Sequence, residues 1–131
     1  MIDVEAITTT YLDGQIATQV VPEAPDDTSE AWVKVTLIDS GQIAAKDQDH
    51  FNVYYLQLDC YPSGDGVEHQ EEASDLCLEV REEMAAMPAA SHTGAVVTAV
   101  RFTGSRRMPD TEFKPPRQRY IVSADVYAHP A

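Results

Sequence analysis

Apolar and polar positions along the chain change their period several times, and each change predicts a new element. Near the start, Val4, Ile7 and Tyr11 recur at helical spacing. They follow Asp3, a residue type that favours the N-cap of a helix. The pattern therefore predicts a first helix over residues 3–12, which ends at the Asp-Gly turn that follows it.

Three segments then have strand character. Residues 16–21 predict a short, weak strand, and residues 31–39 alternate between apolar and polar side chains as a half-buried strand does. Residues 51–61 (FNVYYLQLDCY) are largely apolar or aromatic at both alternating sets of positions. This predicts a central strand that is covered on both sides or buried at an interface.

The clearest helix of the chain is predicted over residues 67–87. Its apolar positions follow 3, 4 and 7 spacing, and they are Ala73, Leu76, Cys77, Val80, Met84 and Met87. Acidic residues fill much of the remaining surface, and Pro88 ends the helix. The outer face of this helix is therefore strongly negative.

Two further strands, residues 95–103 and 119–129, flank a long connection over residues 104–118 (GSRRMPDTEFKPPRQ). In the second strand one face is predicted to carry Tyr120, Val122, Ala124, Val126 and Ala128. The connection is much longer than the roughly 2–5 residues of an ordinary hairpin loop. It is predicted to be an extended arm that either has a function or is a solvated, partly mobile loop.

The resulting order, α-β-β-β-α-β-β, predicts an α+β fold. We expect an antiparallel-rich mixed sheet of four to five strands with two helices packed on it. A chain of 131 residues predicts a single domain over residues 1–131. No apolar run approaches the ~20 residues of a membrane span, and the N-terminus does not resemble a signal peptide, so a cytoplasmic start and no membrane partner are expected.

Charge is distributed unevenly along the chain. The formal net charge is −13, yet six of the nine Lys and Arg residues lie within 101–131. An acidic body with one basic segment is suited to bind copies of itself head to tail. The predicted interface residues are Arg106, Arg107, Lys114 and Arg117 on the arm, Glu72, Glu79 and Glu83 on the acidic helix, and Trp32, which either anchors a partner or caps the core.

Motifs for catalysis or metal binding are weak. Pro109-Asp110 followed by Glu112 and Lys114 is a compressed version of a nuclease PD…ExK pattern, but it lies in a proline-bearing arm that does not favour rigid metal ligands. His69 with Glu72 is a solitary helical pair. Cys60 and Cys77 are interpreted as small buried apolar residues. We therefore expect no catalytic residue, no metal and no cofactor.

Several segments together resemble the tail terminator proteins of long-tailed phages that infect actinobacteria. These segments are DVEAITTTYL, LQLDCYP with the acidic helix after it, GAVVTAVRFTGSRRMPD and PRQRYIVSADVYAHP. The resemblance implies an α+β protein that forms a ring, usually a hexamer, on the head-proximal end of the tail tube. Such a ring stops tube growth and presents a docking surface to the head connector.

The resemblance also implies partners and a location. The partners would be further copies of the chain, the major tail tube protein and the head connector or stopper protein, with DNA passing through the ring without specific binding. The protein would be assembled in the host cytoplasm and would end in the neck of the virion. Two alternatives remain: another neck protein, such as a head-completion protein, and an acidic adaptor or inhibitor that binds a basic partner.

Overall fold

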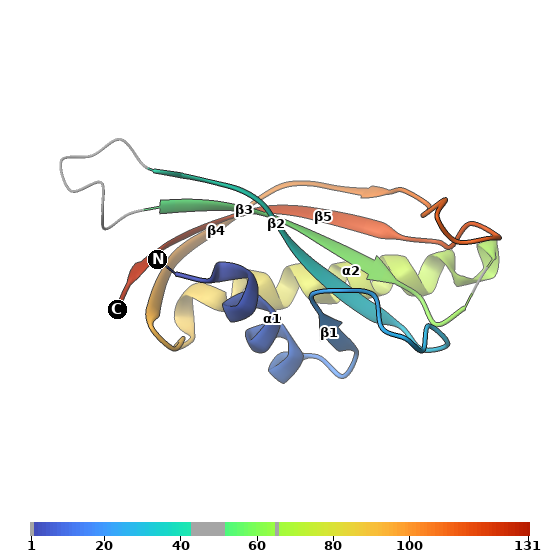
Figure 1. Ribbon diagram of the computed structural model, residues 1–131, viewed down its shortest axis with the longest axis horizontal. Helices are drawn as coiled ribbons and strands as arrows, with labels where there is room; N and C mark the ends of the chain where they lie inside the picture. The colour runs from blue at the N-terminus through green and yellow to red at the C-terminus, as the bar shows by residue number, and fades with distance from the viewer. Residues whose placement is uncertain (1, 43–51, 65) are drawn as a thin grey trace.

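The computed structural model describes residues 2–42, 52–64 and 66–131, and it confirms the predicted α+β class. Five strands form one mixed sheet in the order β1-β2-β3-β5-β4, and both α-helices lie on the same face of that sheet (Figure 1). The element order is the predicted one. Phe51 and His50 lie outside the described residues, as does most of the polar segment after β2.

Helix α1 spans Val4–Gln15. As predicted, Asp3 is its N-cap, and the carboxylate accepts a hydrogen bond of 3.0 Å from the backbone N–H of Ala6. The helix continues past the Asp-Gly turn where it was expected to end. Gly14 lies within its last turn, and the backbone N–H of Ile16 still donates a hydrogen bond to the carbonyl of Leu12. The three extra residues bring Ile16 into the core, where it is 7% exposed.

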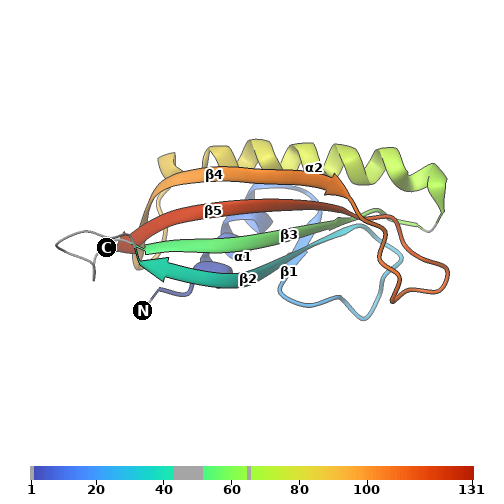
Figure 2. The same ribbon diagram turned by 90° about the horizontal axis from the view of Figure 1, so that it is seen from above.

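Strand β1 (Gln19–Val21) pairs in parallel with β2 (Trp32–Gln42), whereas β2, β3 (Asn52–Tyr61), β5 (Tyr120–Pro130) and β4 (Ala95–Arg107) pair antiparallel. Strand β3 is the third of five, so its predicted central position is confirmed. Its expected cover on both sides is found only in part, because the helices lie on one face of the sheet (Figures 1 and 2).

Helix α2 spans Gln70–Ala85 and is preceded by a 3-10 turn over Val67–His69. A second 3-10 turn over Met87–Ala89 follows it, so the predicted helix is a composite of three pieces. All six of the apolar positions predicted from its periodicity are buried. They contact the apolar side chains of the sheet, and this packing places the acidic side of α2 outward.

The final hairpin is longer than predicted. Strand β4 extends to Arg107 and pairs there with Tyr120, so the first four residues of the expected arm belong to the sheet. The alternation predicted for β5 is confirmed, with Val122, Ala124, Val126 and Ala128 in the core and Tyr120 packed against it. Local strand propensity predicts too short a β4 because its last residues are polar. Cross-strand pairing with β5 keeps these residues in the strand.

The two cysteines are buried as predicted, Cys60 on β3 and Cys77 on α2, and both are free thiols. They lie together where α2 packs on the sheet, and the neighbouring Cys77 together with burial raises the pKa of the Cys60 thiol well above its usual value. The Cys60 thiol therefore stays protonated and acts as a core side chain.

Candidate interaction surfaces

The arm between β4 and β5 folds back onto its own sheet. The backbone of Asp110 exchanges hydrogen bonds of 2.8 and 3.1 Å with that of Arg117, which makes the arm a narrow hairpin. Arg117 is 4% exposed, and its guanidinium lies 4.7 Å from the centre of the Trp32 ring and donates a hydrogen bond of 2.6 Å to the carbonyl of Pro62. The base of the arm is thus a built part of the domain.

Aromatic rings hold this arm in place. Trp32 and Tyr61, opposite one another on β2 and β3, stack with their centroids 4.3 Å apart. Phe113 of the arm lies 6.0 Å from Trp32 and 6.1 Å from Tyr61. These rings cover the end of the sheet face that the helices leave open.

A group of charges lies beneath the rings. Arg119 Nη1 is 3.7 Å from a carboxylate oxygen of Asp59 and 3.6 Å from one of Asp110. The Tyr61 hydroxyl donates a hydrogen bond of 2.8 Å to Asp110, and burial together with this bond raises the pKa of Tyr61. The Asp110 of the PD…ExK pattern is therefore engaged in holding the arm.

This arrangement separates the predicted interface residues of the arm into two groups. Arg106, Arg107 and Lys114 are exposed, and Arg107 also donates a hydrogen bond of 3.1 Å to Gln118. Arg117 is buried, and so is Trp32, which is 0% exposed. The interface role assigned to these two does not fit their burial: Trp32 caps the core, the other interpretation of its position, and Arg117 packs on it.

The predicted acidic residues of α2 also differ in their surroundings. Glu72 is half-buried and accepts hydrogen bonds from the backbone and hydroxyl of Ser63 and from His69. Burial alone would raise the pKa of Glu72, but these hydrogen bonds lower it overall. Glu83 is half-buried, and its carbonyl accepts a hydrogen bond of 2.8 Å from the Tyr11 hydroxyl, whereas Glu79 is exposed.

An acidic groove runs along one side of α2. It has a volume of about 450 Å³, and its lining residues are Thr18, Ala31, Glu68, Glu71, Glu72, Asp75, Leu76 and Glu79. Five of these eight are carboxylates. The groove is therefore strongly negative and suited to a basic partner.

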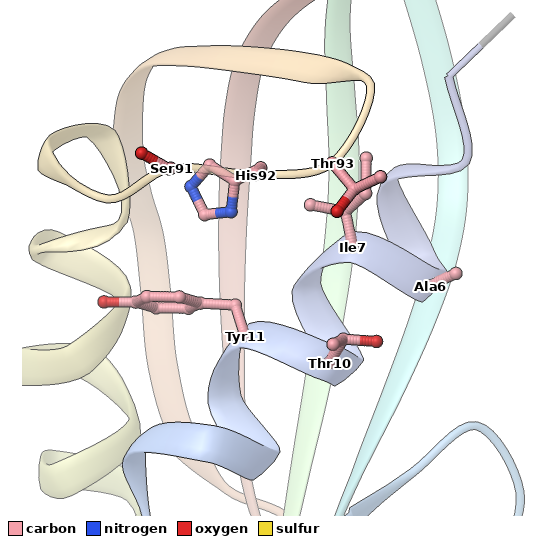
Figure 3. Close-up of a pocket in the computed structure, with 7 residues that line it drawn as sticks. All are labelled: Ala6, Ile7, Thr10, Tyr11, Ser91, His92 and Thr93. Atoms are coloured by element: carbon pink, nitrogen blue, oxygen red, sulfur yellow. The ribbon is translucent and has the colours of Figure 1, made fainter.

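A smaller hollow of about 260 Å³ lies between α1 and the segment before β4 (Figure 3). The Tyr11 and His92 rings meet edge to face in its wall, with centroids 5.4 Å apart. The Tyr11 hydroxyl is bonded to α2, and the imidazole of His92 lies 2.8 Å from the carbonyl of Met87. These polar groups already have partners within the chain, so they hold the segment before β4 in place next to α1 and α2.

A third hollow, of about 230 Å³, lies on the sheet face opposite the helices. Ile38 of β2, Tyr55 of β3 and Thr103 of β4 are among its lining residues. No motif or spacing in the sequence identifies these side chains as a site. Ile38 and Thr103 are extra residues at β-bulges, and no simple period-two pattern shows where a bulge will fall.

Within residues 2–42, 52–64 and 66–131, no three His, Cys, Asp or Glu side chains form a group that would hold a metal ion. None of the helices in the same part of the chain has the length and hydropathy of a membrane span. Neither a protein-family model nor a curated protein sequence matches this chain.

Proposed function

We propose that this chain is a structural phage protein that caps the head-proximal end of the tail tube as a ring of identical copies. In that position it stops tube polymerisation and offers the docking surface for the head connector. The proposal joins the resemblance of its segments to tail terminators with the way its exposed charges are arranged. It requires no chemical reaction, because its activity is the occupation of a polymer end.

The observation that carries the proposal is the separation of exposed charge. Among the described residues, the exposed basic side chains lie on β4 and the arm tip, and they are Arg101, Arg106, Arg107 and Lys114. Exposed carboxylates occupy the outer side of α2, including Glu71, Asp75, Glu79 and Glu82. Two complementary surfaces on separate elements allow heterologous contacts, which close into rings when the rotation permits.

The role is tested by electron microscopy of phage particles made without this protein. We expect overlong tubes without heads, because nothing then ends polymerisation or joins the capsid. Tails of normal length attached to capsids would overturn the proposal. Normal length without capsids would instead favour another neck protein.

The exposed arginines at the end of β4 form a basic strip, Arg106 and Arg107, which is tested by Arg106→Gln combined with Arg107→Gln in an assay of ring formation at low salt. We expect weaker assembly with an unchanged fold, because the variant removes two exposed positive charges. Ala24→Glu with Ala131→Glu changes the net charge equally at other exposed positions and should assemble normally. Equal assembly of both double variants would show that the strip has no part in the ring.

The acidic groove along α2 supports a second candidate, an adaptor or inhibitor that occupies a basic partner. The two candidates differ in what they bind. A tail terminator stacks on preformed tail tubes, whereas an inhibitor binds a basic host protein and leaves tubes unbound. Co-sedimentation with purified tubes separates them.

A further inference from the structure

The two cysteines of the chain face each other where α2 packs on the sheet. Cys60 lies on the side of β3 that also carries Leu56 and Leu58, and this side faces the helices. Cys77 lies on the buried side of α2, together with Val80. The two thiols are free and in hydrogen-bonding contact. A covalent bond between them joins β3 directly to α2.

The surroundings of Cys77 favour its thiolate form. The Cys60 thiol and the Ser105 hydroxyl contact the Cys77 sulfur and donate hydrogen bonds to the thiolate. Arg81, one turn further along α2, adds positive charge, and its guanidinium lies 5.1 Å from the centre of the Phe102 ring. These contacts lower the pKa of the Cys77 thiol, although burial acts in the opposite direction. Cys77 is therefore the more reactive of the two, because the thiolate is the nucleophile.

Cys60 has the opposite character. It is 0% exposed, and its pKa is raised by the contact with Cys77 and by burial. Cys77 is 4% exposed, so its sulfur lies nearer to solvent. A small oxidant from solvent thus reacts first at Cys77, and Cys60 is the thiol in position to react second.

We propose that Cys60 and Cys77 are an oxidative modification site, at which a peroxide converts the two thiols into a reversible disulfide bond. The Cys77 sulfur first attacks hydrogen peroxide, so that an S–O bond forms and the O–O bond breaks. The departing hydroxide takes up the proton that Cys77 has released. The Cys60 sulfur then attacks the sulfenic acid at Cys77; the S–S bond forms, the S–O bond breaks, and the hydroxyl leaves as water with the Cys60 proton. In total, two thiols are oxidised and one peroxide is reduced to two waters.

The bond requires little movement, because the thiols already touch and the sulfurs need only approach to about 2 Å. It closes a loop between residues 60 and 77 and so restricts the unfolded chain. Reductants inside cells keep such a pair as thiols, whereas oxidising surroundings outside cells favour the bond. The protein therefore folds with free thiols and acquires the link later. Bond formation does not depend on the function proposed above.

Peroxide treatment of the full chain, followed by alkylation of the remaining thiols and intact mass measurement, tests the bond. We expect the wild type to lose both alkylatable thiols and two hydrogen atoms while it remains a single chain, and dithiothreitol should restore both thiols. Cys77→Ala should keep its Cys60 thiol under the same treatment. Cys60→Ala should instead gain oxygen at Cys77, because no second thiol is present to displace it.

A matched control moves one thiol by a single position. Cys77→Ala combined with Leu78→Cys keeps two cysteines, but the second then lies outside the buried side of α2, at a position that is 54% exposed. It should form no bond within the chain. Wild-type thiols that survive a treatment sufficient to oxidise free cysteine, oxygen added to the wild type without a bond, or an equal yield of internal bond in the control would each overturn the proposal.

Urea denaturation with and without dithiothreitol measures what the bond does to stability. We expect the oxidised wild type to unfold at a higher urea concentration than the reduced protein, because the bond constrains the unfolded chain. The reductant should leave the midpoint of the control variant unchanged. An oxidised wild type that unfolds no later than the reduced one would contradict a stabilising link between β3 and α2. Tail length and capsid attachment decide the proposed function separately.

Discussion

Arg119 shows how one side chain determines the conformation of the arm. It lies near the carboxylates of Asp59 and Asp110, and its Nε donates a hydrogen bond of 2.9 Å to the carbonyl of Met108. The two aspartates are only 3% and 8% exposed. Carboxylates with so little access to water require a nearby cation, and Arg119 supplies it.

Replacing Arg119 with Met should therefore reduce the free energy of unfolding by roughly 3 kcal/mol. Urea denaturation of the variant and the wild type measures this loss. Arg101→Met, at an exposed position on β4, should change stability by less than about 0.5 kcal/mol; an equal loss there would contradict the role of Arg119.

The two sides of helix α2 differ in residue type and in exposure. The side toward the sheet is apolar and fully packed, with Val80 and Met84 at 0% exposure. The side toward solvent carries the exposed carboxylates Glu71, Asp75, Glu79 and Glu82 together with the exposed Leu78. Core packing and exposed charge are thus separated on one element, because neighbouring positions of a helix face different directions.

A matched pair of leucines tests this separation. Leu76→Ala should destabilise the protein by about 2–4 kcal/mol, because Leu76 is 6% exposed and its truncation leaves a cavity. Leu78→Ala, the same change at a residue that is 54% exposed, should cost less than about 0.5 kcal/mol. Thermal unfolding followed by circular dichroism compares them, and similar losses would show that Leu78 is also part of the core.

At the scale of the whole molecule, one face of the sheet is covered by helices and one end of the other face by the arm (Figures 1 and 2). Trp32 is at the covered end, stacked on Tyr61 beneath Arg117. It is the single tryptophan of the chain. Its fluorescence therefore reports on the arm end, whereas circular dichroism reports mainly on the helices and the sheet.

We expect both signals to change at the same denaturant concentration. The arm is joined to the sheet through buried charges and rings, so it should unfold together with the core in one cooperative transition. Native Trp32 emission should lie at short wavelength, since the ring is 0% exposed, and should shift to longer wavelength on unfolding. A fluorescence transition at lower denaturant would show that the arm end opens separately.

Most elements could be predicted from the sequence because their information is local. The spacing from Ala73 to Met87 identifies the buried side of α2, and the alternation from Tyr120 to Ala128 identifies that of β5. The roles of Trp32 and Arg117 could not be predicted in this way. Their burial depends on contacts with Phe113 and Tyr61, which come from other parts of the chain.

By itself the sequence determined the helices, the strands, the core-facing positions and the division into acidic and basic segments, since side-chain period and composition are properties of neighbouring residues. Tertiary structure alone decided that the arm folds onto its own sheet, that Asp110 forms an ion pair with Arg119, and that two bulges create a hollow opposite the helices. These features arise from pairings between distant residues, such as Asp59 with Arg119, and their energies exist only after the chain has brought the partners together.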